Sequence, residues 1–287
     1  MRSRLRLSVA ASLDLPANDA IGLHDSDKLA LRLTPRDVFA RVAPVGREVA
    51  QFEVDLAQRL IEAGCPVCPL GPGADPRVYT RDGFAVTPWT YYEPVTPHTS
   101  PVDYAKALDQ LHTGMRQVDM PSPRFTARIT EAEEVVADPD RSPELTGADR
   151  VFLSGRLASP RRAIDDRGAV EQLLRGEPYP GNVLSTRNGS LFIDLETCCS
   201  GPVEFDLANV PGAVCERCSS VGQGLLDECR QLVIAMVAAW RRELGDRFPD
   251  EWRFGEELLR EGPPWPALDT VTRRGAAAQA AGRAQSG

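Results

Sequence analysis

Three polar side chains that could act together in one reaction lie near one another in the sequence. The carboxylate of Glu177 comes five residues before the carboxamide of Asn182, and a second carboxylate, Asp194, follows after a short connection. A carboxylate can accept the proton of an attacking hydroxyl, and amide and carboxylate oxygens are ligands that Mg²⁺ accepts. This combination is the one that phosphoryl transfer by kinase-type enzymes requires.

The segment that carries the first two residues is expected to be a stiff loop. Pro178, Pro180 and Gly181 interrupt it. Proline lacks a backbone N–H, and glycine adopts dihedral angles closed to other residues, so neither a regular helix nor a regular strand fits. We therefore expect the loop to present Glu177 and Asn182 to the same site.

The third residue is expected at the end of a strand. Residues 191–193, Leu-Phe-Ile, form a short apolar run after a polar turn, which predicts a buried strand that delivers Asp194. Because side chains alternate along a strand, Glu196 is expected on the same side as Asp194.

In three ordered blocks the chain resembles the aminoglycoside phosphotransferase-like family of small-molecule kinases. The family pattern reads His-Gly-Asp-x-His-x-x-Asn, then a strand that ends in Ile-Asp, then Gly-Asp-Pro-x-x-Asp-Leu-Ala. This chain has Arg-Gly-Glu-Pro-Tyr-Pro-Gly-Asn at 175–182, Ile-Asp at 193–194 and Gly-Pro-Val-Glu-Phe-Asp-Leu-Ala at 201–208, with matching spacing.

The resemblance implies an α+β, bilobal protein-kinase-like fold. Residues 1–93 would form a small N-lobe with an antiparallel sheet and one helix. Residues 94–270 would form a larger, mainly helical C-lobe with the catalytic loop and the acceptor cleft. Residues 271–287, rich in Ala, Gly, Arg and Gln, are expected to be a disordered tail.

Hydrophobic periodicity supports this organisation. It predicts an antiparallel three-stranded meander, a helix marked by apolar residues from Val49 to Leu60, two further strands, and several helices in the second half. The strands are expected at 20–23, 29–33, 37–43, 67–72 and 83–87, and the later helices at 105–115, 130–138, 147–167 and 224–244.

The resemblance also implies roles for the residues of the three blocks. Glu177 would orient the acceptor hydroxyl, while Asn182 and Asp194 would hold Mg²⁺ on the phosphates of ATP. Asp206 in the third block would hold the backbone of the loop rather than touch a substrate.

Four more residues fall at family positions for the nucleotide. Arg41 stands where the third strand of a kinase carries lysine, and Glu53 on the following helix would pair with it; a solvated surface glutamate is the alternative. Trp89 and Tyr91 fall where the family has its hinge. Their rings could stack on adenine or simply pack the junction of the lobes.

Several residues depart from the family pattern. Gly22 stands alone where a glycine-rich loop would cover the phosphates, and Arg175, Glu177 and Tyr179 replace His, Asp and His. Two functions from different classes stay open. One is an ATP- and Mg-dependent phosphotransferase acting on a hydroxyl of a small molecule, such as an aminoglycoside-like or other antibiotic-type metabolite. The other is a kinase-like protein with weakened transfer that serves as a nucleotide-dependent binder, a regulator or a repurposed biosynthetic enzyme.

Composition narrows the partners. The formal net charge is −8 and the isoelectric point is about 5.1, which argues against nucleic acid and suits a cationic acceptor. The acidic segment 130–138 would favour such an acceptor if it lines the acceptor cleft; a solvated helix face is the alternative. No apolar run reaches the ~20 residues that span a bilayer, so we expect a soluble protein with no membrane partner.

Seven cysteines include two CxxC pairs, at 65–68 and 215–218. Four thiolates could bind zinc, but the two pairs are far apart in the sequence. The odd number of cysteines favours free thiols in a reducing, cytoplasmic setting.

Overall fold

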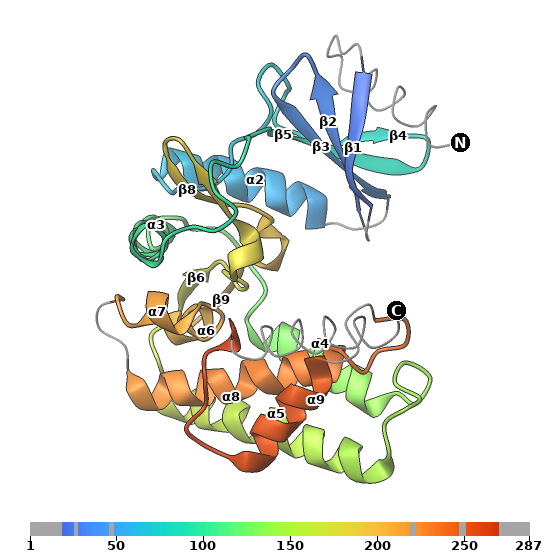
Figure 1. The fold of residues 1–287 in the computed structure, drawn as a ribbon, viewed down its shortest axis with the longest axis vertical. Helices are drawn as coiled ribbons and strands as arrows, with labels where there is room; N and C mark the ends of the chain where they lie inside the picture. The colour runs from blue at the N-terminus through green and yellow to red at the C-terminus, as the bar shows by residue number, and fades with distance from the viewer. Residues whose placement is uncertain (1–18, 26–27, 46–48, 219–221, 247–250, 270–287) are drawn as a thin grey trace, which may run out of the picture. The chain divides into compact units, whose positions relative to one another are not determined.

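The computed structural model describes residues 19–25, 28–45, 49–218, 222–246 and 251–269 (Figure 1). The disordered tail expected at 271–287 lies outside these residues. The chain folds as two compact units. The first unit is Met1–Met120 with Gly181–Thr197, and the second unit is Pro121–Pro180 with Cys198–Gly287.

The first unit is built on a five-stranded antiparallel sheet in the order β1-β2-β3-β5-β4. The meander expected from the sequence is therefore confirmed. The strands are β1 (Asp19–Asp25), β2 (Leu29–Thr34), β3 (Val38–Pro44), β4 (Tyr79–Arg81) and β5 (Phe84–Thr90).

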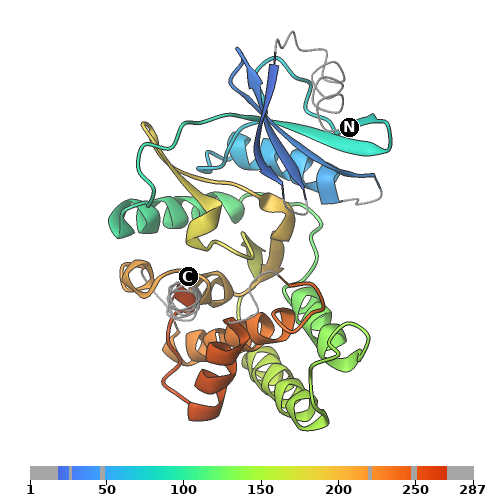
Figure 2. The same cartoon turned by 45° about the vertical axis from the view of Figure 1, so that its right-hand side comes forward.

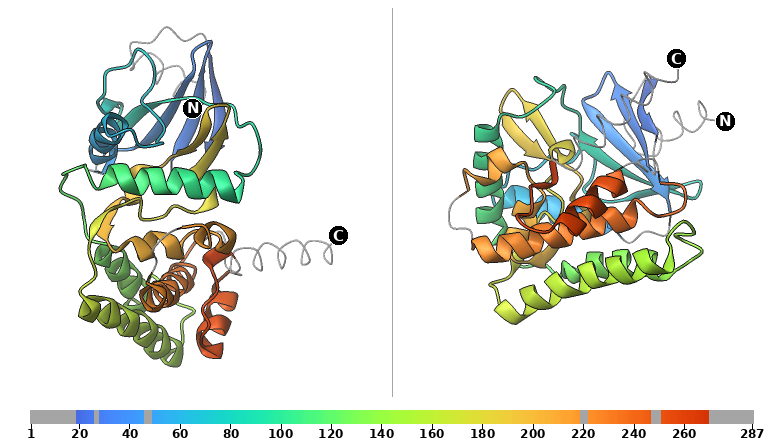
Figure 3. Two further views of the ribbon diagram at one scale, coloured as in Figure 1. Left: turned by 90° about the vertical axis from the view of Figure 1, so that its left-hand side faces the viewer. Right: turned by 60° about the horizontal axis from the view of Figure 1, so that its bottom comes forward.

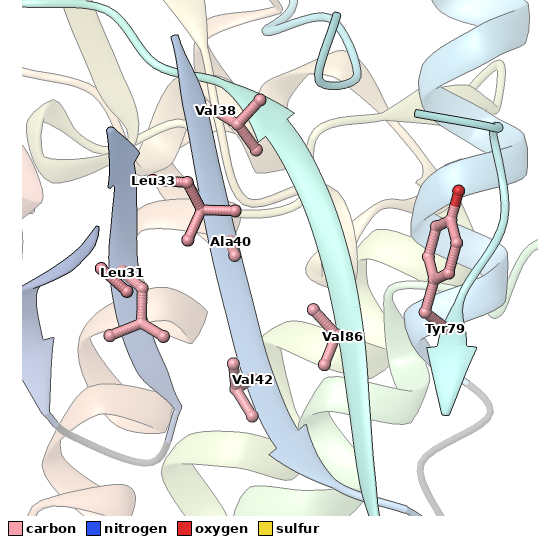
Figure 4. Packing of buried hydrophobic residues seen from close by; sticks show 8 residues of the cluster. Leu31, Leu33, Val38, Ala40, Val42, Tyr79 and Val86 are labelled. Atoms are coloured by element: carbon pink, nitrogen blue, oxygen red, sulfur yellow. The ribbon is translucent and has the colours of Figure 1, made fainter. Parts of the chain in front are cut away.

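Side chains alternate between the two faces of this sheet. One face carries a buried apolar cluster, and burying such side chains stabilises the sheet by about 25 cal/mol per Å² of apolar surface. The members labelled in Figure 4 are Leu31, Leu33, Val38, Ala40, Val42, Tyr79 and Val86. Arg41 lies between Ala40 and Val42 on β3 and therefore belongs to the opposite face.

Helix α2 (Val49–Glu62) lies beside the sheet (Figures 1 and 2). Its apolar residues recur at three- and four-residue spacing, so it buries one stripe and confirms the predicted helix. Helix α3 (Pro101–Met115) covers the helix expected at 105–115 and begins after Ser100, whose side chain accepts the N–H of Asp103. The hairpin of β7 (Val183–Thr186) and β8 (Gly189–Phe192) completes this unit.

The strand expected at 67–72 is not formed, and that prediction was wrong. Val67 and Leu70 make only isolated bridges, to Phe192 and Trp89. Three prolines in residues 66–72 lack the N–H that a continuous ladder needs.

The second unit is mainly helical, with α8 (Gln223–Trp240) in contact with most of its helices (Figure 3). Residues 147–167 form a helix, as predicted. Helix α8 ends at Trp240, four residues before the predicted end at Leu244. The last helix was not predicted. The remaining elements are α4 (Thr126–Ala137), α5 (Gly147–Arg167), α6 (Val203–Ala208), α7 (Gly212–Cys215), α9 (Glu251–Glu261), β6 (Gln172–Leu174) and β9 (Cys199–Gly201).

Helix α3 and the β7–β8 hairpin belong to the same compact unit as the sheet, whereas the sequence placed both in the second lobe. The boundary at residue 93 stays a prediction. Among the described residues, no helix combines the length and apolarity needed to cross a bilayer.

Candidate functional site

Arg41 on β3 and Glu53 on α2 form the ion pair expected from the sequence. Nη1 of Arg41 lies 2.7 Å from Oε1 of Glu53, and the Glu53 side chain is only 4% exposed. The alternative of a solvated surface glutamate was therefore wrong. A buried carboxylate of this kind needs a cationic partner, which Arg41 supplies.

The same guanidinium binds a second carboxylate. Nη2 of Arg41 lies 2.6 Å from Oδ1 of Asp194, and Oε1 of Glu53 also accepts the backbone N–H of Leu195 at 2.8 Å. Burial lowers the pKa of Arg41, but the charges of Glu53 and Asp194 outweigh burial and raise this pKa above its usual value. A charged guanidinium thus ties β3 and α2 to the turn at 194–195.

Asn182 and Asp194 flank the open end of the β7–β8 hairpin. Val183 pairs with Phe192, and the N–H of Ile193 donates to the backbone oxygen of Asn182 at 3.0 Å. The strand ends at Phe192, one residue earlier than expected, and Asp194 takes a left-handed conformation with φ of 61°. Such a backbone is uncommon outside glycine and often marks a functional position.

Glu196 lies on the side of Asp194, but not for the reason given by the sequence. Residues Leu195–Thr197 form a 3₁₀ turn, so the expectation based on strand alternation was wrong. Oε2 of Glu196 lies 3.8 Å from Nη2 of Arg41 and also forms an ion pair with Nζ of Lys28.

These charged groups line a small pocket within the first unit. Its floor is the sheet face that carries Arg41, and small side chains there leave space. The lining residues are Lys28, Arg41, Ala43, Val49, Ala50, Glu53, Ala85, Thr87 and Glu196.

Lys28 was missed by the sequence analysis. Lys28 stands one residue before β2, and Ala30, two residues later, pairs with Arg41 across β2 and β3. Because Lys28 lies outside the strand, the alternation of side chains does not fix its direction, and only the pocket lining and the ion pair with Glu196 place it beside Arg41.

The Mg²⁺ expected from the sequence fits the donors present. Among the residues that the structure describes, no group of three His, Cys, Asp or Glu side chains could hold a metal. Asn182 and Asp194 nevertheless offer hard oxygen donors, and Mg²⁺ commonly takes one or two carboxylates and fills its shell with phosphate oxygens and water. This pair suits Mg²⁺ that binds together with a nucleotide.

In the second unit, Asp206 holds the backbone of the loop as expected. Its two carboxylate oxygens accept the N–H groups of Arg175 and Gly176 at 2.9 and 2.8 Å. The amide of Asn209 adds a contact to the backbone oxygen of Gly176 at 3.4 Å. The Arg175 side chain, which replaces the family histidine, is fully buried.

Glu177, the proposed base, forms an ion pair with Arg128 of α4. The guanidinium of Arg128 also lies 4.6 Å from the ring centroid of Trp240. Arg128 was not found from the sequence, because no local spacing links residues 128 and 177. Tyr179 is exposed.

The two aromatic residues assigned to adenine differ in exposure. Trp89 is 5% exposed and its indole N–H donates to Oγ1 of Thr87, which favours a packing role. Tyr91 is half-buried, with the guanidinium of Arg32 4.0 Å from its ring centroid. Their roles toward a nucleotide stay predictions, as do those of Glu177, Asn182 and Asp194.

All seven cysteines are free thiols, and all except Cys218 are buried. Burial raises the pKa of Cys65 to about 11 and that of Cys68 to about 12. Both thiols are therefore protonated at neutral pH.

Comparison with known proteins gives one family. The model of the phosphotransferase enzyme family matches residues 21–265. A search among curated protein sequences found no match.

Several solved structures are similar over most of the chain. Choline kinase LicA from Streptococcus pneumoniae has a TM-score of 0.61 at 14% identity, over 97% of this chain and 100% of that chain. Amicoumacin kinase hAmiN, in complex with AMP-PNP, Ca²⁺ and Ami, has 0.66 at 11%, over 88% and 91%. Spectinomycin phosphotransferase APH(9)-Ia, with ADP and spectinomycin, has 0.59 at 13%, over 94% and 97%. These likenesses confirm the α+β, bilobal protein-kinase-like fold.

Proposed function

We infer, since this chain belongs to the phosphotransferase enzyme family, that it transfers a phosphoryl group from ATP to a hydroxyl group of a small molecule. The observation that carries this proposal is the bridge by which Arg41 joins Glu53 and Asp194. Phosphoryl transfer is promoted chiefly by positioning and electrostatics, so a cation and a metal ligand fixed in advance are what it needs.

The nucleotide half of the proposal uses the first unit. Arg41 would neutralise charge on the phosphates, and Glu53 would position Arg41 through the ion pair. Asn182 and Asp194 would hold Mg²⁺, which neutralises developing charge on phosphate oxygens when it is bound. The side chain of Asp194 is 35% exposed and binds Arg41 through Oδ1, so this carboxylate can contact both Arg41 and a ligand.

The acceptor half uses the second unit. Glu177 would orient the acceptor hydroxyl and accept its proton. Glutamate is one methylene longer than the family aspartate, and a misplacement of about 1 Å can cost about 100-fold in rate. The contacts of Asp206 with the backbone before Glu177, and of Arg128 with Glu177 itself, support a defined position for this carboxylate.

The similar proteins support the choice of a nucleotide donor and a small-molecule acceptor. The structures that hold AMP-PNP or ADP support a nucleotide donor, and the names of all three proteins refer to small molecules. A cationic acceptor stays a prediction. The acidic helix α4 adds no support for it, because each glutamate of this helix already pairs with an arginine: Glu131 with Arg128, Glu133 with Arg161 and Glu134 with Arg141.

The proposal is tested by nucleotide binding and by turnover. Mg·ATP should raise the melting temperature of the wild type, because a ligand at 100 times its Kd stabilises by about 2.7 kcal/mol. ADP release should then depend on one member of a panel of cationic amino alcohols, aminoglycosides and neutral polyols. No stabilisation by Mg·ATP would contradict the proposal.

Two variants test nucleotide binding and turnover separately. Asp194→Asn should remove Mg-dependent nucleotide binding, while Glu177→Gln should remove turnover and leave nucleotide affinity unchanged. Glu171→Gln, at an exposed ion pair with Arg124, is the control and should keep both. Full turnover by Glu177→Gln would reject its role as the base.

The ion pair between Arg128 and Glu177 also favours a second candidate, a nucleotide-dependent binder with weakened transfer. In that function the carboxylate stays engaged by arginine and accepts no proton. Mg·ATP binding without ADP release across the whole acceptor panel, in the wild type and in Arg128→Ala, would favour this candidate.

A further inference from the structure

We propose that Lys28 is a second phosphate-binding cation of the nucleotide site, acting beside Arg41. The proposal rests on the proposed function and adds a residue that no motif in the sequence indicates. Lys28 is one of only two lysines in the chain, the other being Lys106.

Lys28 lies beside Arg41 at the edge of the sheet. Ala30 pairs with Arg41, and Arg41 pairs with Thr87, across β2, β3 and β5. Lys28 stands one residue before β2, so its place follows from its contacts rather than from the alternation of side chains along a strand. Lys28, Arg41 and Thr87 line the same pocket.

A shared carboxylate shows that the two cations converge. Oε2 of Glu196 forms an ion pair with Nζ of Lys28 and lies 3.8 Å from Nη2 of Arg41. One oxygen atom is therefore within ion-pair distance of both cations. A phosphate oxygen that takes the place of this carboxylate oxygen would meet the same two positive charges.

The bonding of Arg41 explains why a second cation is needed. Its Nη1 and Nη2 atoms are directed at Glu53 and Asp194, at 2.7 and 2.6 Å. Much of its hydrogen-bonding capacity is thus used to hold the site together. Lysine is a compact, rotatable point charge on a flexible stem, which can move from Glu196 to a phosphate without disturbing that bridge.

The charges of the site suit such an exchange. Two cations, Lys28 and Arg41, face three carboxylates, Glu53, Asp194 and Glu196. Without a metal ion this group carries a net negative charge and repels a polyphosphate. Mg²⁺ reverses that balance, so nucleotide affinity should depend strongly on Mg²⁺.

The test is isothermal titration of ATP, ADP and adenosine, each with Mg²⁺, into the full chain. Lys28→Ala should weaken ATP and ADP binding by about 10- to 100-fold, since a hydrogen bond to a charged group has that effect. Adenosine, which has no phosphate, should bind Lys28→Ala as it binds the wild type. Lys28→Arg keeps the charge and should recover most of the ATP affinity.

Lys106→Ala is the matched control, because Lys106 is exposed on α3 and lines no part of the pocket. It should bind all three ligands as the wild type does. Equal ATP affinity for Lys28→Ala and wild type would overturn the assignment of Lys28 alone. An equal loss for adenosine and ATP would also overturn it, because the lysine would then be structural. Failure of the wild type to bind Mg·ATP would overturn both this inference and the proposed function.

Discussion

Nη2 of Arg41 lies 2.6 Å from Oδ1 of Asp194, a residue 153 positions further along the chain. Through its other nitrogen, the same guanidinium holds Glu53. One side chain thus joins a strand, a helix and the turn that follows a distant hairpin. The bridge gives the proposed nucleotide half its shape before any ligand binds, which is the form of preorganisation that favours phosphoryl transfer.

Loss of this guanidinium should cost stability as well as activity. Arg41→Met leaves the buried carboxylate of Glu53 without its cation, and we expect the free energy of unfolding to fall by about 3 kcal/mol. Urea denaturation measures the change. Arg36→Met, in the exposed turn between β2 and β3, should change it by less than about 0.5 kcal/mol. Similar losses for the two variants would show that the bridge adds nothing.

Removal of the Asp206 carboxylate should loosen the loop that carries Glu177. Asp206→Ala leaves the buried N–H groups of Arg175 and Gly176 without their acceptor, which should cost about 3 kcal/mol. Hydrogen exchange of these two amides should become much faster. Glu204→Ala, on the same helix but with one exposed contact to Gly222 at 3.2 Å, is the control. Unchanged exchange in Asp206→Ala would contradict the assignment.

Gly114 lies where α3 approaches the segment after α2. A Cβ atom there would collide with Sγ of Cys65 and stand 3.2 Å from the backbone oxygen of Ala63. Gly114→Ala should therefore destabilise the protein by about 1–3 kcal/mol, despite the better helix propensity of alanine.

Two further variants test that explanation. Gly155→Ala on α5 meets nothing within 4 Å and should stabilise by about 0.5–1 kcal/mol. Adding Cys65→Ala to Gly114→Ala removes the sulfur and should recover part of the loss. If the double variant is no more stable than expected from the two single variants, the collision is not the cause.

The contribution of two buried thiols to the stability of the folded protein should fall as the pH rises. Burial raises the pKa of Cys65 to about 11 and that of Cys68 to about 12, so the neutral thiols stabilise the folded state below the ordinary thiol pKa of about 8.5. This contribution is lost as pH rises through about 9 to 12.

Thiol labelling followed by mass spectrometry tests whether the two thiols are buried and protonated in the folded protein. At pH 8 the native protein should react first at Cys218, which is half-buried, while Cys65 and Cys68 should react only after unfolding in guanidinium. Rapid labelling of Cys65 in the native protein at pH 8 would contradict its raised pKa.

The sequence was sufficient for contacts that a known pattern specifies. The pairing of Arg41 with Glu53 and the support of the loop by Asp206 follow from the positions of these residues in ordered blocks. It was not sufficient for Lys28 with Glu196 or Arg128 with Glu177. Those pairs join distant segments through long side chains, whose directions depend on packing.

The sequence by itself determined the three-stranded meander, the helices at 49–62 and 147–167, the loop interrupted by prolines, and the faces of the sheet, because these follow from local periodicity and backbone restrictions. Apart from Arg41 and Glu53, only the tertiary structure decided which charges meet. Asp194 faces Arg41 from a left-handed backbone position after β8, and Glu196 does so from a 3₁₀ turn. Each conformation is held by contacts with residues more than a hundred positions away, and no local pattern in the chain records such contacts.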